Sequence, residues 1–426
     1  MARSLEQWLD YQGQVHPQAI VLGLDRLRLV LDSLGWKQSK VPVITVAGTN
    51  GKGSVSAYCT AILSAAGYRV GTFTSPHLRE YRERIRIHDR LATPEELVDA
   101  FERIETARGD IKLTFFEYNT LAALLLFDAA KLDAWVLEIG MGGRLDAVNI
   151  VEPDATVVVS IGFDHQQFLG DSLEAIAREK AGIFRPGKAA VIGGREPAPV
   201  LESVALQIGA PLKRLAIEYN YVRDGAGWRY RGTVWNLPQL PAPALPGDIQ
   251  FANAAAALAT LESIDSRLSI DARAIATGLQ TARLPARFQV IQPSTGPGWI
   301  LDVAHNADAA RVLARNLNGS KTSGRTLAVC GILADKDVTA IASALDTCID
   351  VWWCASIEGA RGQDGAALAE QVRQQVSAPV NVADGIPAAC AAAAAAAMPA
   401  DRILVFGSFH TVGPALDYLE AQGLLP

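Results

Sequence analysis

A glycine-rich segment with one lysine and one serine is the part of the sequence best suited to chemistry. It reads Val46-Ala47-Gly48-Thr49-Asn50-Gly51-Lys52-Gly53-Ser54, after an apolar stretch of strand length and before a helical pattern. In such a turn, backbone N–H groups converge on phosphate oxygens, a lysine adds positive charge, and a serine hydroxyl reaches a magnesium ion. Val46 replaces the first glycine of the usual phosphate loop and Gly53 separates Lys52 from Ser54, so a turn without a ligand is the alternative. The lysine and the preceding strand favour phosphate binding.

Side chains suited to metal binding follow other apolar stretches. Glu138 lies at the end of one of them, a position from which an acid meets the metal of a bound nucleotide, although an acid there can instead cap a loop. Four of the six histidines lie in glycine-, serine- or asparagine-containing segments at predicted strand ends: His77, His165, His305 and His410. Ligands of open α/β sheets gather at such ends. We predict that His165, next to Asp164, is a metal ligand, whereas His77 and His410 could equally order loops.

Length and composition indicate a globular protein of two domains. The 426 residues exceed what one hydrophobic core usually supports, and 50% of them are hydrophobic. The net charge of −6 gives no general attraction to nucleic acid or anionic lipid, so we expect neither as a partner. Five cysteines without CxxC pairs argue against a disulfide framework and a zinc site, and the N-terminus lacks the apolar run of a signal peptide. We therefore expect a cytoplasmic protein without a membrane span.

Apolar runs of strand length alternate with helical patterns in the N-terminal part of the chain. The predicted strands are 41–47, 69–73, 134–139, 155–161 and 189–192, and the predicted helices are 53–66, 94–108, 117–130 and 172–183. This alternation predicts an α/β domain of the mononucleotide-binding class, with a mostly parallel sheet covered by helices. Residues 213–246 are rich in Tyr, Trp, Arg, Gly and then Pro, which predicts a small antiparallel insert or a surface loop.

A second series of strands follows. It begins near Phe288 and continues at 299–303, 326–330, 351–354, 380–382 and 402–406, each run separated from the next by a helical stretch. This series predicts a second, smaller α/β domain. A proline within 283–287 marks the hinge, because proline and the residue before it disfavour helix. We therefore expect a nucleotide-binding domain at 1–285 and a second domain at 286–426.

Several segments together resemble one enzyme family. Residues 48–54 resemble the ATP loop of the folylpolyglutamate synthases and dihydrofolate synthases, which are members of the Mur ligase superfamily. Segments that resemble the family in the same order are 74–78, 115–117, 137–149, 164–165, 178–184, 301–306, 335–337 and 407–411. The resemblance implies a P-loop-type ATP-binding domain, a C-terminal Rossmann-like ligase domain and an active site in the cleft between them.

The resemblance also implies ligands for ATP and metal. The residues implied for ATP are Gly48, Thr49, Asn50, Gly51, Lys52, Gly53, Ser54, Asn253, Arg287 and Asp302. Ser54 and Glu138 would hold one magnesium ion, and Ser75 and His165 would help to hold a second. A helix-capping role for Asn253 and a solvent-facing position for Arg287 are the alternatives.

The catalytic residues implied by the resemblance are Lys52, Lys180, Asp302 and His305. Lys180 matches a lysine that is often N-carboxylated in the superfamily, which would turn it into a carboxylate that supports the second metal. A solvated surface lysine is the alternative. His305 is our candidate for the base that deprotonates the attacking amine. Val303 stands where the family has glycine, and valine disfavours a positive φ.

A pterin site is implied by a third set of matches. Its residues are Ile20, Val21, Leu22, Thr114, Phe115, Phe116, Glu117, Leu145, Asp146 and Ala147. Phe116 would stack on the flat ring, and Asp146 would accept hydrogen bonds from the amino-pterin edge. The N-terminal arm at 20–22 would close over the ring. Two adjacent phenylalanines are in general more typical of a core.

The implied activity is that of an ATP-dependent carboxylate–amine ligase. It would phosphorylate the carboxylate of dihydropteroate or of a reduced folate and join the acyl phosphate to L-glutamate. The resemblance implies two magnesium ions and leaves room for a potassium ion, and we expect a monomer. The alternatives are another Mur-type ligase, which adds an amino acid to a cell-wall nucleotide precursor, and a regulatory ATPase. The sequence does not decide whether both synthase activities are present, and we predict both.

Overall fold

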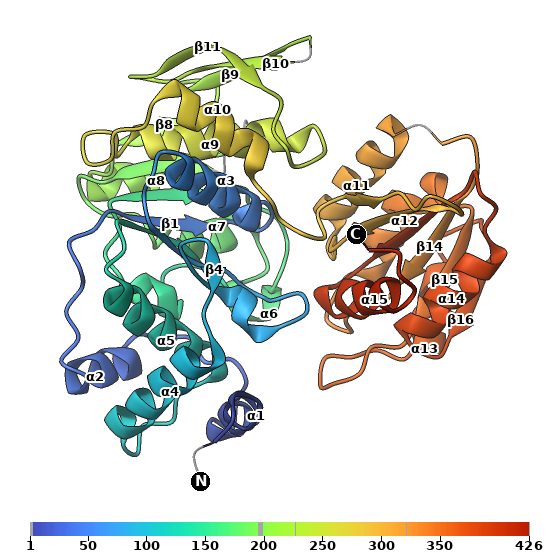
Figure 1. Ribbon diagram of the computed structural model, residues 1–426, viewed down its shortest axis with the longest axis horizontal. Helices are drawn as coiled ribbons and strands as arrows, with labels where there is room; N and C mark the ends of the chain where they lie inside the picture. The colour runs from blue at the N-terminus through green and yellow to red at the C-terminus, as the bar shows by residue number, and fades with distance from the viewer. Residues whose placement is uncertain (1–2, 195–198, 226, 321, 426) are drawn as a thin grey trace. The chain divides into compact units, whose positions relative to one another are not determined.

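The computed structural model describes residues 3–194, 199–225, 227–320 and 322–425, and the chain divides into two compact units (Figure 1). Unit 1 comprises Met1–Ala244 and Gln250–Arg283, and unit 2 comprises Leu245–Ile249 and Leu284–Pro426. The division after Arg283 lies close to the boundary expected between residues 285 and 286. The short segment Leu245–Ile249 belongs to unit 2, which nothing in the sequence indicated.

Unit 1 contains the mostly parallel sheet that the alternating pattern predicted. In spatial order its strands are β4 (Arg90–Leu91), β3 (Ile85–Ile87), β2 (Val70–Phe73), β5 (Ala134–Glu138), β1 (Val43–Ala47), β6 (Ala155–Val158), β7 (Ala189–Ile192) and β8 (Leu212–Arg214). From β2 to β8 the neighbours run parallel, and β3 and β4 add an antiparallel edge. Every residue of β1 and β5 is buried, which explains why these strands read as continuous apolar runs.

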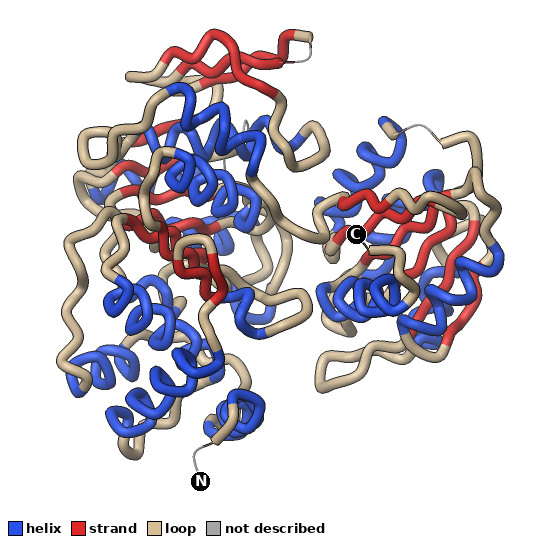
Figure 2. Tube along the Cα trace, viewed as in Figure 1, coloured by secondary structure: helices blue, strands red, loops and turns tan. Residues whose placement is uncertain are grey.

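Helices pack around this sheet, some directly on its strands and some on other helices (Figure 2). They are α1 (Leu5–Val15), α2 (Asp25–Ser33), α3 (Lys52–Ala65), α4 (Pro94–Arg108), α5 (Phe115–Ala130), α6 (Gln166–Leu169), α7 (Leu173–Ala181), α8 (Pro199–Ile208), α9 (Ile249–Glu262) and α10 (Ala272–Thr281). Thr93 caps α4 and Pro94 opens it, as predicted. Helix α5 begins at Phe115, two residues before the predicted start, because Thr114 is its N-cap.

The segment predicted as an antiparallel insert or a loop contains a three-stranded antiparallel sheet. Its strands are β9 (Asn220–Asp224), β10 (Gly227–Arg231) and β11 (Asn236–Pro241), with β10 in the middle. Glu262, the last residue of α9, is buried and accepts a hydrogen bond from the Tyr230 hydroxyl at 3.0 Å and others from the backbone of Val234 and Trp235. The insert is therefore attached to the end of α9 through one carboxylate.

Unit 2 is a second α/β layer structure. Its strand order is β12 (Gln289–Ile291), β13 (Gly298–Asp302), β17 (Arg402–Phe406), β14 (Thr326–Cys330), β15 (Val351–Ala355) and β16 (Val380–Ala383). All neighbours are parallel except β12 and β13. The helices are α11 (Ala307–Gly319), α12 (Val338–Leu345), α13 (Gly365–Arg373), α14 (Ile386–Ala396) and α15 (Phe409–Ala421). The alanine-rich helix α14 is half-buried, with Ala389, Cys390 and Ala393 inside.

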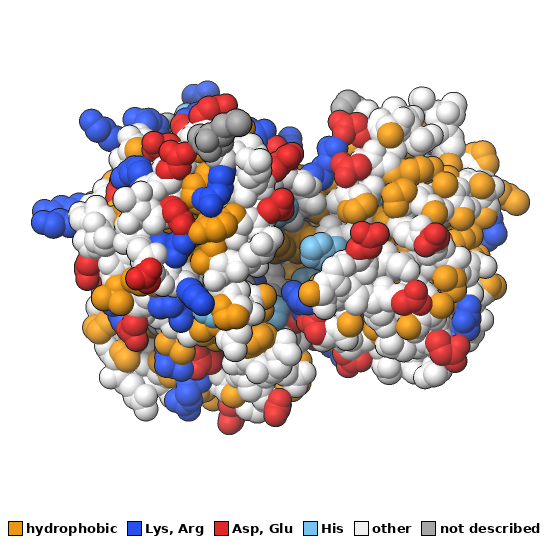
Figure 3. Space-filling model, turned by 90° about the horizontal axis from the view of Figure 1, so that it is seen from below, with side chains coloured by type: hydrophobic (Ala, Val, Ile, Leu, Met, Phe, Trp, Pro, Cys, Tyr) orange, Lys and Arg blue, Asp and Glu red, His pale blue; other side chains and the backbone are white. Residues whose placement is uncertain are grey.

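The surface carries charges of both signs. On the face shown in Figure 3, Lys and Arg side chains are interspersed with Asp and Glu side chains rather than gathered in one patch. This distribution agrees with the small net charge of −6. None of the helices in the described part of the chain is long and apolar enough to cross a membrane.

Candidate active site

The glycine-rich loop connects β1 to α3 and is held by the segment that follows β6. The Thr49 hydroxyl accepts a hydrogen bond from Gly162 N at 3.0 Å, and Thr49 N donates to Ser160 O at 2.9 Å. Asn50 N donates to the Ser160 hydroxyl at 2.9 Å. The next residue, Gly51, is the N-cap of α3 and has no side chain to cover the first amides of the helix. These amides and the positive end of the helix dipole are available to an anion.

Gly51 is required by two features of its surroundings. Its φ of 87° lies in the left-handed region, and a Cβ added to it would lie 2.7 Å from Val159 Cγ1 and 2.9 Å from Asn253 Oδ1. Asn253, the residue implied for adenine, thus lies beside the phosphate loop. It lies within α9, and its amide donates to Gln250 Oε1 at 3.1 Å. A helix-capping role for Asn253 is therefore wrong.

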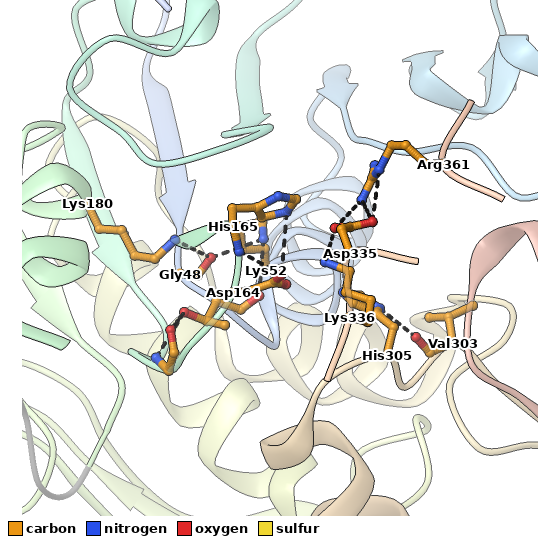
Figure 4. A network of polar contacts seen from close by, with 12 residues as sticks. Gly48, Lys52, Asp164, His165, Lys180, Val303, His305, Asp335, Lys336 and Arg361 are labelled. Carbon is orange, nitrogen blue, oxygen red and sulfur yellow. Dashed lines mark hydrogen bonds and ion pairs between the residues drawn. The ribbon is translucent and has the colours of Figure 1, made fainter. Parts of the chain in front are cut away.

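Two lysine ammonium groups meet at one carbonyl oxygen of the loop. Lys52 Nζ donates to Gly48 O at 3.0 Å, and Lys180 Nζ donates to the same oxygen at 3.1 Å (Figure 4). Lys180 comes from α7 and is 5% exposed, so the alternative of a solvated surface lysine is wrong. Burial, and then the charge of Lys52, lower the pKa of Lys180 to about 7, against the opposing effects of Asp164 and Asp146.

The residues implied for metal follow strands that end at one edge of the sheet. Ser75 follows β2, Glu138 ends β5, the phosphate loop with Ser54 follows β1, and His165 follows β6. These strands are neighbours and parallel, so their carboxyl ends lie together, where open α/β sheets bind ligands. In register, Glu138 pairs with Val46, the residue before the loop begins to turn.

The side chains at this edge fit a hard divalent cation. Ser54 and Glu138 are both buried, and a hydroxyl and a carboxylate are the oxygen donors that magnesium prefers when nucleotide phosphates complete its coordination. The described residues contain no cluster of three or more His, Cys, Asp or Glu side chains that could hold a metal by themselves. His165 has a left-handed backbone with φ of 53°, and its N–H donates to Asp164 Oδ1 at 2.9 Å.

The residues implied for the pterin surround the start of α5. Thr114 and Glu117 form a capping box: Glu117 Oε2 accepts from Thr114 N at 2.7 Å, and the Thr114 hydroxyl accepts from Glu117 N at 3.3 Å. The other oxygen of Glu117 accepts two hydrogen bonds from Arg26. Both oxygens of this buried carboxylate are thus engaged in fixing the helix start and the N-terminal arm.

The two adjacent phenylalanines are half-buried rather than part of the interior core. The Phe116 ring packs on Phe73, with centroids 5.9 Å apart, and it lies 2.5 Å from the position of a Cβ added to Gly140. Phe115 contacts Tyr81 edge-on at 6.0 Å. A glycine at position 140 is therefore what lets the Phe116 ring lie against the segment after β5.

The N-terminal arm is attached to the turn that contains Leu145 and Asp146. Gly23 N donates to Leu145 O at 3.0 Å, and Arg26 donates to Val21 O at 3.1 Å. Asp146 accepts hydrogen bonds from Met141 N at 2.8 Å and Val148 N at 3.0 Å. Burial raises the pKa of Asp146 to about 6 against these hydrogen bonds and the charge of Lys52. The other implied pterin residues also lie in unit 1, namely Ile20, Leu22, Phe115, Phe116 and Ala147.

In unit 2, Asp302 fixes the segment that contains Arg287. Its carboxylate accepts from Phe288 N and from Ala304 N, both at 2.8 Å. Burial raises the pKa of Asp302, and the charge of Arg287 opposes this shift. Ala286 and Phe288 both have positive φ, 58° and 46°, whereas position 303 is not among the described residues with positive φ. The unusual backbone lies around Arg287, and valine at position 303 is tolerated.

His305 is oriented by the backbone of its own loop. Its Nδ1 lies 2.8 Å from Val303 O, and because a carbonyl oxygen can only accept, Nδ1 carries the proton in this contact (Figure 4). Arg287 is half-buried with its guanidinium 5.3 Å from the Phe409 ring centroid, so a fully solvent-facing position is wrong.

Asp335 binds Arg361 at 2.8 Å. Burial and the charge of Arg361 lower the pKa of His410.

Comparisons with known proteins identify the family. The Mur ligase middle domain matches residues 46–261, and the Mur ligase, glutamate ligase domain, matches residues 286–409. The dihydrofolate synthase/folylpolyglutamate synthase of Escherichia coli K12 is 43% identical over 421 residues, which are 99% of this chain and 97% of that protein. The chain belongs to the dihydrofolate synthase/folylpolyglutamate synthase family. It is an ATP-dependent Mur-type ligase.

Further relatives of this ligase agree. The Haemophilus influenzae protein of the same name is 38% identical over 96% of both chains. The structure of Escherichia coli FolC in complex with DHPP and ADP superimposes with a TM-score of 0.93 at 42% identity and covers 99% of both chains. A bifunctional folylpolyglutamate synthase/dihydrofolate synthase with Mn, AMPPNP and L-glutamate bound has a TM-score of 0.90 at 42% identity and covers 98% of both.

Sequence reasoning missed two arginines of this ligase. Arg26 links Glu117 to the N-terminal arm, and Arg84 is buried beside Phe115. Arg84 and Arg86 alternate with Ile85 and Ile87, and this pattern predicts that both arginines lie on the exposed face of a strand. For Arg26, the partner is 91 positions away, and only the fold brings the two residues together.

Proposed function

We propose that this ligase joins the amine of L-glutamate to the carboxylate of dihydropteroate and to the glutamyl tail of reduced folates. The observation that carries the proposal is the order of groups along one sheet edge: a phosphate loop, hard metal donors and an aromatic site for a flat ring. The relatives crystallised with DHPP and ADP and with Mn, AMPPNP and L-glutamate support the same substrate classes.

The chemistry begins with activation of the carboxylate, because a carboxylate and an amine do not condense at neutral pH. The carboxylate oxygen attacks the γ-phosphorus of ATP, ADP leaves, and an acyl phosphate forms. Lys52 and the first amides of α3 neutralise the charge on the transferring group. The glutamate amine then attacks the acyl carbon and phosphate leaves. His305 is our candidate for the base that accepts the proton of the amine, and the contact of its Nδ1 with Val303 O orients the ring.

Nucleotide and metal would be held by the following residues in this proposal. Ser54 and Glu138 would hold one magnesium ion, Ser75 and His165 would help to hold a second, and a potassium ion would be an additional cofactor. Magnesium supplies charge neutralisation at the phosphates. Gly48 to Ser54 cradle the phosphates, Asn253 contacts the adenine, and Arg287 and Asp302 contact the nucleotide. The attachment of Thr49 and Asn50 to Ser160 supports this role, because it gives the loop a fixed shape before ATP arrives.

We propose further that Lys180 is N-carboxylated in the active enzyme. Its neutral Nζ attacks the carbon of dissolved CO2, an N–C bond forms, and one proton is lost to solvent, which leaves a carbamate anion. The low pKa of about 7 supports this step, since it supplies neutral amine at physiological pH. The carbamate nitrogen keeps one N–H and can retain the hydrogen bond to Gly48 O. Its oxygens are hard donors for the second metal.

The pterin ring stacks on Phe116 in this proposal, with Asp146 as acceptor for its amino edge. Phe115, Leu145 and Ala147 line the ring, and the arm at 20–22 covers it. Thr114 and Glu117 act by fixing the start of α5, since their hydrogen bonds to one another and to Arg26 engage both carboxylate oxygens.

The compartment and the assembly state are part of the proposal. All five cysteines are free and buried, which suits the reducing cytoplasm. We expect the enzyme to act there as a monomer, which size-exclusion chromatography with light scattering would test.

The test of function is phosphate release with mass spectrometry of the product. We expect release only when ATP, magnesium, L-glutamate and either dihydropteroate or a reduced folate are all present, with one glutamate added per phosphate. Equal release without glutamate would favour the regulatory ATPase. Turnover with a uridine nucleotide precursor in place of the pteroate would favour another Mur-type ligase. The two pterin substrates are offered separately, which decides whether both synthase activities are present.

A further inference from the structure

Arg84 is a buried cation whose one side-chain hydrogen bond among the described residues goes to a histidine. It ends the short 3₁₀ helix Tyr81–Arg84 and is 8% exposed. Its Nε donates to His77 Nδ1 at 2.8 Å, and its guanidinium lies 5.5 Å from the Phe115 ring centroid and 6.0 Å from that of Tyr81. A guanidinium has five N–H donors, and this hydrogen bond uses one of them.

The charge of Arg84 is not balanced by a bound carboxylate of the described residues. Glu83 and Glu138 are close enough for their charges to act on Arg84, but neither forms a hydrogen bond with it. The Glu83 carboxylate instead accepts from the backbone N–H groups of Leu78 at 2.7 Å and of Arg79 and Glu80 at 2.9 Å. Burial without a paired anion is unfavourable for a charged group, and it lowers the pKa of Arg84. Such a residue needs an anion that arrives with a ligand.

We propose that Arg84 binds the substrate carboxylate that becomes phosphorylated, and then the acyl phosphate formed from it. This assignment rests on the proposed ligase function. Arginine binds carboxylate and phosphate groups in a planar, two-point geometry. Arg84 lies beside Phe115 at the proposed pterin site and is within range of the charge of Glu138, the proposed metal ligand. A carboxylate bound by Arg84 would therefore lie between the proposed pterin site and the proposed metal site, where ATP has to activate it.

A purely structural role is the competing explanation. Arg84 could serve only to fix His77 and the loop that contains Ser75, and in that case its loss would loosen the loop for every ligand. The two roles predict different affinities of the Arg84 variants for a neutral substrate analogue. They also differ in stability, since removing an uncompensated buried charge is neutral or stabilising, whereas removing a structural support is destabilising.

The experiment compares dihydropteroate with its carboxamide, which keeps the ring system and lacks the charge. Binding is measured by calorimetry without metal or nucleotide, so that magnesium cannot hold the carboxylate. The variants are Arg84→Met, Arg84→Lys, and Arg86→Met as the matched control, since Arg86 is the exposed arginine of the adjoining strand β3. We expect the wild type and Arg86→Met to prefer the carboxylate by about tenfold or more.

In Arg84→Met, we expect this preference to disappear while the carboxamide binds within about twofold of its wild-type affinity. Arg84→Lys, which keeps the charge and loses the two-point geometry, should keep part of the preference. The melting temperature of ligand-free Arg84→Met should equal or exceed that of the wild type. An unchanged preference, an equal loss of both ligands, or a clear drop in melting temperature would each overturn the assignment. A wild type that binds neither ligand but releases phosphate as a ligase would overturn the assignment alone, whereas failure of the phosphate-release test would refute the proposed function.

Discussion

Lys52 and Lys180 donate to one and the same acceptor, the carbonyl oxygen of Gly48, at 3.0 and 3.1 Å. Two ammonium groups at one oxygen repel each other, and the charge of Lys52 is one cause of the low pKa of Lys180. Binding of phosphate by Lys52 and loss of the positive charge of Lys180 would each relieve this repulsion.

Lys52→Ala and Glu138→Ala should each lower kcat by at least about a hundredfold, on the order of 3 kcal/mol of lost transition-state stabilisation. Both groups are proposed to act on the transferring phosphoryl group, so folding should be unaffected. Phosphate release measures the rate, and circular dichroism checks the fold. A folded variant of near-normal activity would show that the assignment of that residue is wrong.

Lys180→Ala should lose most activity and keep the fold, and acetate or formate should restore part of the activity by supplying a carboxylate in the vacated space. Lys180→Arg should fail as well, because arginine keeps its positive charge and cannot form a carbamate. Mass spectrometry of the intact protein under CO2 and under nitrogen gives a second readout. Full activity of Lys180→Arg would rule out the carbamate.

The buried Lys180 should also make stability depend on pH. Its pKa is lowered to about 7 in the folded state, so between pH 7 and the unfolded value of 10.5 the unfolded chain binds the additional proton. Stability therefore rises with pH across this window, by up to about 1.4 kcal/mol per pH unit. In CO2-free buffer, Lys180→Met should be more stable than the wild type at pH 6.5, and this advantage should shrink by pH 9.

The control for that experiment is Lys112→Met, which removes an exposed lysine of the same unit. Its stability difference from the wild type should be the same at both pH values. Urea denaturation at pH 6.5 and pH 9 measures the free energy of unfolding. A Lys180→Met advantage that does not change with pH would contradict the cost assigned to the buried ammonium.

Gly51→Ala should raise the KM for ATP by on the order of tenfold or more, because the new Cβ would displace Asn253 and Val159. Gly67→Ala is the matched control. Gly67 has nearly the same φ, 89° against 87°, but nothing lies within 4 Å of its added Cβ. Both variants should lose about 1 kcal/mol of stability through the strained backbone, and only Gly51→Ala should bind ATP poorly. Equal KM values for ATP would contradict the close packing of Asn253 on the loop.

Arg26→Gln should raise the KM for dihydropteroate about tenfold and leave the KM for ATP unchanged, because Arg26 joins Glu117 to the carbonyl of Val21 in the arm. Arg28→Gln, on the same helix, removes an exposed pair with Asp25 and should change neither value. Steady-state kinetics with each substrate varied in turn gives both constants. A parallel rise in the KM for ATP would mean that Arg26 supports the whole unit rather than the arm.

The sequence predicts those parts of the fold whose signals are local. The loop from Gly48 to Ser54 lies between an apolar strand and a helix, and Thr93 with Pro94 begins α4 where the capping pattern indicates. The short β3 and β4 strands went unpredicted, since three and two residues are too few to show a period. The burial of Lys180 was also beyond local reasoning, because its neighbour Glu179 and its helix both suggest a solvated residue.

Long-range relationships account for most of what the sequence could not predict in the site. The hydrogen bond of Lys180 to Gly48 spans 132 positions, and the bond of Arg26 to Glu117 spans 91. Family resemblance supplied the names of many site residues but not their partners. Glu117 shows the difference: the resemblance places it among the pterin-site residues, but it does not reveal that its oxygens accept hydrogen bonds from Thr114 and Arg26.

The burial of every cysteine makes the protein well suited to site-specific fluorescent labelling. Maleimides react with thiolates, and burial raises the pKa of Cys59 and of Cys390 to about 12, so the native thiols should react slowly. A cysteine introduced at the exposed Lys112 of unit 1 and another at the exposed Glu370 of unit 2 should take up a donor and an acceptor dye without removal of native cysteines. Energy transfer between the dyes would then follow the distance between the two units through each step of the catalytic cycle.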